Sequence, residues 1–148
     1  MKIAITWWEY TGKYTPFIGH ISSPIMRNLD TGEEVSSRDL PIGACYDCNK
    51  PANPDEGDNR LCYLYPVGAD GLSIACRLPD GSDWHIDSRA SNCDMKEDNV
   101  HRCWVRHGTI HEQLHVDKKG HTCGAGAGSI QVPTWHGFLH SGELSESG

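Results

Sequence analysis

Short apolar runs, repeatedly interrupted by turn-forming residues, constrain this chain more than any other feature. The 148 residues include 16 glycines and 8 prolines, a share above the roughly 12% of an average protein. The longest near-apolar run, residues 61–69, has about half the length that a membrane-spanning helix needs. This pattern disfavours a helical bundle. We therefore expect a mainly β fold, a single compact β-rich domain with long irregular loops and little helix.

The expected domain covers residues 1–148, and its parts differ in regularity. Residues 2–8 are rich in Ile, Thr and Trp and predict a strand. Residues 1–60 otherwise carry most of the prolines, and we expect an irregular amino-terminal part. Residues 61–140 form the β-rich part, and the polar residues 141–148 are expected to be a solvated tail.

Paired apolar segments separated by turn residues predict hairpins in the β-rich part. The clearest turn is Gly68-Ala69-Asp70-Gly71, and another is Pro79-Asp80-Gly81-Ser82. The predicted strands of this part are residues 61–67, 72–78, 83–87, 100–106, 113–117, 129–132 and 135–139.

The net charge of the chain limits the classes of molecule that it is expected to bind. With 13 basic and 20 acidic residues, the formal net charge is −7 at pH 7. A protein that binds the phosphate backbone of nucleic acids carries excess positive charge, so nucleic acid is disfavoured as a partner. The amino terminus has one lysine and a brief apolar stretch, without the features of a signal peptide. We expect a protein without a membrane span that is not secreted by a signal peptide.

Seven cysteines are many for a chain of this length. In a reducing cytosol, such richness indicates metal ligands or reactive thiols before disulfides. The odd number also leaves at least one thiol outside any set of intrachain pairs. Disulfides stay open as an alternative if the chain is exported by another route.

Four longer sequence motifs in the second half of the chain resemble those of a known protein family. They are WHIDSRASNC at residues 84–93, HRCWVRHG at 101–108, VDKKGHTCGAGAGSI at 116–130 and HGFL at 136–139. This pattern resembles a family of small, uncharacterised phage and prophage proteins, over a little more than a third of the chain. The resemblance implies a phage or prophage origin, with the host cytoplasm or the virion as location. It implies no reaction.

Three cysteines inside these motifs form the first candidate metal site. Zn²⁺ prefers four thiolate or imidazole ligands in a tetrahedron, and Cys93, Cys103 and Cys123 would supply three. His101 lies two residues before Cys103, so a strand would place both on one face. We expect His101 as the fourth ligand, with His107 as its substitute. Buried free thiols are the alternative interpretation.

A second candidate site begins at Cys45-Tyr46-Asp47-Cys48, a CxxC pair. Cys62 and Cys76 would complete a Cys₄ zinc site with this pair. Zinc ribbons usually use a second tight pair, which this chain lacks, so the pattern is weak.

The segment His111-Glu112-Gln113-Leu114-His115 spells HExxH. On a helix, His111 and His115 would bind Zn²⁺, His121 would be the third ligand and Glu112 the general base of a hydrolase. Gly, Thr, Ile and Val around the motif are poor helix formers. The other interpretation is an exposed, histidine-rich hairpin, in which no residue is catalytic.

Two hypotheses about function follow. The first is a phage-encoded, non-enzymatic binding or structural protein that is stabilised by Zn²⁺ and binds a phage or host protein. The second is a zinc-dependent hydrolase that uses the HExxH segment. The sequence favours the first, and it leaves the partner, the oligomeric state and any substrate open.

Overall fold

β-strands make up nearly all the regular structure of this computed structural model. The structure describes residues 2–16, 18–19, 22–48, 71–88, 90, 92–95, 97, 103–108, 110–120, 123–125 and 128–146. These residues form three sheets and one short 3₁₀ helix, η1 (Ser37–Asp39), and within them no α-helix occurs. The predicted mainly β fold, with long irregular loops and little helix, is confirmed.

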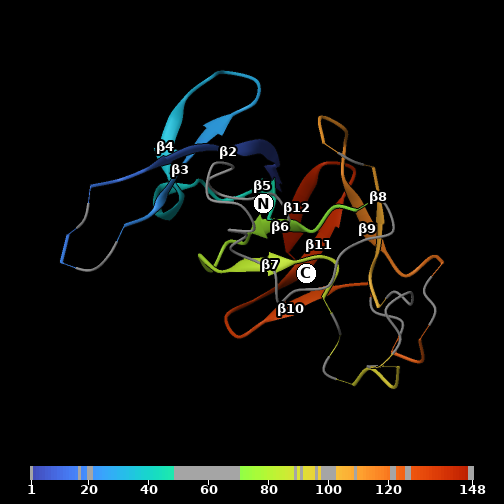
Figure 1. Cartoon of the computed structure of the whole chain (residues 1–148). Helices are drawn as coiled ribbons and strands as arrows, with labels where there is room; N and C mark the ends of the chain where they lie inside the picture. The colour runs from blue at the N-terminus through green and yellow to red at the C-terminus, as the bar shows by residue number, and fades with distance from the viewer. Residues whose placement is uncertain are drawn as a thin grey trace.

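The largest sheet has six strands in the order β4-β3-β2-β5-β6-β7 (Figure 1). Neighbours are antiparallel except β2 and β5, which are parallel. A parallel pair needs a crossover connection, and β3, β4 and η1 provide it here. The strand bounds are β2 Thr6–Tyr14, β3 Pro24–Asn28, β4 Glu34–Ser36, β5 Ala44–Asp47, β6 Ile74–Arg77 and β7 Asp83–His85.

A four-stranded antiparallel sheet has the order β1-β12-β11-β10, and a third sheet pairs β8 with β9. Along β11, buried residues alternate with more exposed ones, as expected for a strand with one face on the core. In Figure 1 the β8–β9 hairpin stands beside β11. The bounds are β1 Lys2–Ala4, β8 Val105–His107, β9 His115–Asp117, β10 Ile130–Val132, β11 Trp135–His140 and β12 Glu143–Glu146.

The main core joins the sheets through apolar side chains. Trp7 from β2, Ile74 from β6, Val116 from β9 and Leu139 from β11 belong to one buried cluster. Trp8 points to the opposite face of its sheet and packs in a second cluster, because successive side chains of a strand alternate. Both faces of the central strands are therefore buried.

Several predicted strands are confirmed with shifted ends. Residues 79–82 separate β6 from β7, β8 pairs with β9, and β10 pairs with β11. Residues 61–67, expected as a hairpin arm, lie outside the described residues. Among those, the neighbours of β6 are β5 and β7.

The amino-terminal part is more regular than we predicted. β2 continues past residue 8 to Tyr14, and three further strands, β3, β4 and β5, lie in the segment that we expected to be irregular. Local turn chemistry explains part of the difference. After β3, the Asn28 carboxamide accepts hydrogen bonds from the amides of Asp30 (2.8 Å) and Thr31 (3.1 Å), which turns the chain toward β4. Pro24 stands at the first residue of β3, a position where strands accept proline.

The predicted solvated tail is wrong for residues 143–146, which form β12 between β1 and β11. A two-residue turn at Ser141 and Gly142 precedes the strand, and both have positive φ angles, 52° and 80°. This combination matches the twist of antiparallel hairpins. Leu144 is 1% exposed and anchors β12 in the core. Because the residues on either side of Leu144 are polar, the sequence pattern did not indicate this strand, which has one buried position.

Candidate metal centre

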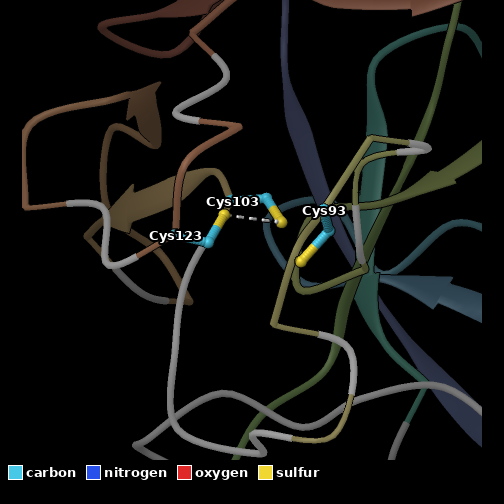
Figure 2. A group of neighbouring side chains, drawn as sticks. All are labelled: Cys93, Cys103 and Cys123. Atoms are coloured by element: carbon cyan, nitrogen blue, oxygen red, sulfur yellow. Dashed lines mark hydrogen bonds between the residues drawn. The ribbon is translucent and has the colours of Figure 1, made fainter.

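Three loops bring Cys93, Cys103 and Cys123 together (Figure 2). Cys93 follows β7, Cys103 lies two residues before β8, and Cys123 lies between β9 and β10. Their exposed fractions are 6%, 1% and 4%. Cysteines that are up to 30 residues apart in the sequence thus belong to one small buried cluster, which is separate from the main core cluster.

The sulfur atoms of this cysteine group all lie within 4.8 Å of one another. The Sγ atoms of Cys103 and Cys123 are 3.4 Å apart, the contact drawn as a dashed line in Figure 2. Tetrahedral zinc with Zn–S bonds of about 2.3 Å holds its sulfurs about 3.8 Å apart. The group could therefore hold a metal ion such as zinc. Among the described residues, it is the single group of His, Cys, Asp or Glu that meets this distance criterion.

Backbone hydrogen bonds shape the loops around the sulfurs. The amide of Cys93 donates to the carbonyl of Ala90 (3.1 Å), which makes a tight turn, and the amide of Met95 donates to Cys93 Sγ (3.4 Å). An amide directed at sulfur stabilises a thiolate more than a neutral thiol. The amide of Gly124 donates to the Asp94 carboxylate (3.1 Å) and ties the Cys123 loop to the Cys93 loop.

Burial decides the protonation of Cys103. Desolvation raises the pKa of Cys103 most. A backbone hydrogen bond from Ala90 lowers it, contacts with the thiols of Cys123 and Cys93 raise it again, and the resulting pKa is about 12. At neutral pH, Cys103 is a neutral thiol when no cation is bound. A metal ion would have to displace its proton, which makes metal affinity dependent on pH.

Trp104 connects the cysteine group to the rest of the protein. Its ring packs against both the main core and the cysteine group. Its indole nitrogen donates a hydrogen bond to the Ser129 carbonyl at 2.9 Å. The residue that follows Cys103 is therefore held by packing on two sides and by this hydrogen bond.

The predicted fourth ligand, His101, lies outside the described residues. Its substitute, His107, lies in β8 with Nε2 at 3.0 Å from the Asp117 carboxylate. The group that meets the metal-distance criterion contains the three cysteines without His107.

The second predicted site does not assemble among its described members. Cys45 of β5 and Cys76 of β6 face each other across the sheet, whereas Cys48 packs in the cluster on the opposite face. Cys45 lies in β5, and Cys48 is the turn residue that follows this strand. The two cysteine side chains belong to different core clusters, so this CxxC pair does not join its sulfurs. The Cys48 thiol instead donates to the Ser73 carbonyl at 3.3 Å. Cys62 lies outside the described residues.

Burial and the neighbouring Cys76 raise the pKa of Cys45 well above the ordinary value for a thiol. Both side chains are fully buried. In this arrangement Cys45 and Cys76 act as small apolar core residues.

The HExxH segment forms no helix. His111 is in a turn with a φ of 72°, and His115 belongs to strand β9. The one-turn spacing that a zinc hydrolase requires is therefore absent. Glu112 is exposed in the same turn, and its carbonyl accepts a hydrogen bond from the Trp7 indole at 3.2 Å. The helix that the hydrolase alternative requires is absent here, and the other interpretation, a histidine-rich hairpin, agrees with the pairing of β8 and β9. His121, the third ligand of the hydrolase alternative, lies outside the described residues.

The hairpin brings together a histidine–aspartate group that we did not predict. The Asp117 carboxylate lies 3.0 Å from Nε2 of His107 and 3.0 Å from Nε2 of His115. The Ser141 amide donates to His115 Nδ1 (3.2 Å), so the His115 proton lies on Nε2 and is donated to Asp117. His140 stacks on His115 with ring centroids 4.6 Å apart. The H-x-D spacing at 115–117 was the available signal, since it places both side chains on one strand face.

Comparison of this chain with family models, with curated proteins and with solved structures found no match. The described residues contain no helix that is long and apolar enough to span a membrane.

Proposed function

We propose that Cys93, Cys103 and Cys123 bind one Zn²⁺ ion, with His101 as the fourth ligand, and that this site stabilises a non-enzymatic binding or structural protein. The observation that carries the proposal is the convergence of three buried sulfurs within 4.8 Å. Irregular loops supply all three cysteines. Because strand pairing does not hold such loops in place, a cross-linking ion would add most to their stability. A structural site has its ligand positions filled by protein, which leaves none for a substrate.

The donor set fits zinc on chemical grounds. Thiolates with an imidazole form one of the standard structural zinc sites. The Met95 amide that points at Cys93 Sγ is suited to a thiolate ligand, because such contacts from outside the ligand shell orient and tune metal ligands. When bound, the ion would supply a cross-link between three loops and no reaction.

The proposal extends to the origin, the partner and the location of the protein. The four sequence motifs favour a phage or prophage origin, with a phage or host protein as partner and the host cytoplasm or the virion as location. These statements depend on the resemblance alone.

Elemental analysis of the purified protein tests the metal site. We expect about one zinc ion per chain, lost in Cys103→Ser and retained in Cys48→Ser, a matched control in which the buried cysteine belongs to another cluster. His115→Ala should keep its zinc. Loss of zinc from His115→Ala but not from Cys103→Ser would favour the hydrolase hypothesis, and wild-type protein without metal would refute the proposal.

A further inference from the structure

We propose that Cys103 and Cys123 are a site of reversible oxidation, at which hydrogen peroxide joins the two sulfurs in a disulfide and releases the bound metal. The inference rests on the proposed zinc site, because the two residues are also its ligands. Their Sγ atoms are 3.4 Å apart, and a disulfide bond is about 2.05 Å long. A movement of about 1.4 Å would therefore close the bond.

The location of this pair allows such a movement. Cys103 and Cys123 both lie outside the strands of the described residues, so the register of a strand pair does not fix the distance between them. Cys45 and Cys76 also face each other, but they are held in register by β5 and β6 with 0% exposure. Cys123 keeps 4% of its surface exposed, which gives a small oxidant one point of entry.

The chemistry balances with peroxide as the oxidant. One thiolate attacks hydrogen peroxide, so that an S–O bond forms, the O–O bond breaks and, after protonation, water leaves. The second thiolate then displaces the sulfenic oxygen as a second water molecule, and the S–S bond forms. In total, two thiolates, one peroxide and two protons give one disulfide and two waters. The two sulfurs lose two electrons, which the peroxide takes up.

Oxidation would change the loops as well as the metal. A disulfide consumes two of the three sulfurs, so the ion would keep Cys93 and the fourth ligand alone and would dissociate. The Cys93 loop would then lose its metal link, while Cys103 and Cys123 stay joined. Trp104 follows Cys103 directly and bonds to the Ser129 carbonyl, so its fluorescence should report the change.

The test uses the full-length, zinc-loaded protein. Hydrogen peroxide is added in steps, released zinc is measured with a colorimetric chelator, and disulfides are mapped by alkylation and mass spectrometry. We expect a Cys103–Cys123 disulfide and about one zinc ion released per disulfide. Dithiothreitol with added zinc should restore the starting state. Cys48→Ser should behave like wild type.

Two results would overturn the inference. One is a disulfide that joins a different pair, and the other is a protein that keeps its zinc and its free thiols in excess peroxide. Cys93→Ser supplies a second version of the test, because it keeps both sulfurs of the reactive pair. If the purified protein binds no zinc, the proposed function fails by itself. Disulfide mapping of the peroxide-treated, metal-free chain then still decides whether Cys103 and Cys123 are the oxidised pair.

Discussion

The rings of Trp84 and Trp104 meet edge to face, with centroids 5.3 Å apart and an angle of 86° between their planes. Trp84 belongs to the main core, and Trp104 also contacts the cysteine group. Edge-to-face pairs add about 0.5–1.5 kcal/mol beyond the burial of their surface. The stability of the cysteine group is therefore linked to that of the main core.

Trp104→Ala should lower the free energy of unfolding, because it removes a large, partly buried ring; we expect a loss below the about 3–5 kcal/mol of a fully buried tryptophan. It should also weaken zinc binding. Urea denaturation and zinc titration measure the two effects. Trp104→Phe keeps an aromatic ring but loses the bond to Ser129, so we expect a smaller loss. Equal losses in both variants would mean that the ring contact contributes little.

Removal of zinc with a chelator should lower the melting temperature. An ion present at 100 times its dissociation constant stabilises a protein by about 2.7 kcal/mol, or about 5–10 °C for a domain of this size. Differential scanning calorimetry with and without chelator measures the shift. Cys103→Ser should melt at the same temperature in both conditions; a chelator effect that persists in this variant would argue for a different metal site.

A buried ion pair gives a further prediction. Arg106 Nη2 lies 3.4 Å from Asp87 Oδ2, and the side chains are 7% and 4% exposed. Arg106→Met would leave a buried carboxylate without this cation and should cost about 3–5 kcal/mol. The double variant Arg106→Met/Asp87→Leu should lose less than the sum of the single variants, as measured by denaturation in a double-mutant cycle. Additive losses would show that the pair is not coupled.

The stability should also depend on Asp117 in acid. Burial by itself would raise the pKa of Asp117, but hydrogen bonds from His107, the Lys119 amide and His115 outweigh it and hold the pKa below its ordinary value. A lowered folded-state pKa stabilises the protein above the unfolded-state pKa of about 3.9, and this contribution is lost as the pH falls through the folded-state pKa. Wild type should therefore exceed Asp117→Asn in stability at pH 6 by more than at about pH 3. Denaturation midpoints across this range check the sign, and a constant difference would contradict it.

Leu144→Ala tests the carboxy-terminal strand. Because Leu144 is 1% exposed, truncation of its side chain should cost about 2–5 kcal/mol. Ser145→Ala, on the neighbouring, less buried position of β12, is the matched control and should change stability by less than about 0.5 kcal/mol. A neutral Leu144→Ala would restore the interpretation of this segment as a solvated tail.

Much of the fold could be predicted from local signals. Turns such as Pro79–Ser82 and alternation such as that of Trp135–His140 mark strands directly. The same signals failed for β12, where Leu144 is the one fully buried residue. They also failed for the long-range pairing of β2 with β5, which no local pattern encodes.

The cysteine group was predictable from residue types, but its geometry was not. Cys93, Cys103 and Cys123 were chosen because zinc prefers sulfur, and the structure brings all three together. The CxxC at Cys45 and Cys48 was a weak pattern, and its two cysteines lie in different core clusters, because spacing alone does not fix the direction of the side chains. For HExxH at residues 111–115, the poor helix formers around the motif already indicated a histidine-rich hairpin, and β8 pairs with β9 in the structure.

The pairing of β1 with β12 connects Ile3 to Leu144, and this has a consequence for biosynthesis. During translation, β1 leaves the ribosome long before its partner strand exists. Until residues 143–146 emerge, the paired edge of β1 stays open to other chains. We therefore expect nascent chains to need protection by chaperones, and stalled, shortened chains to aggregate.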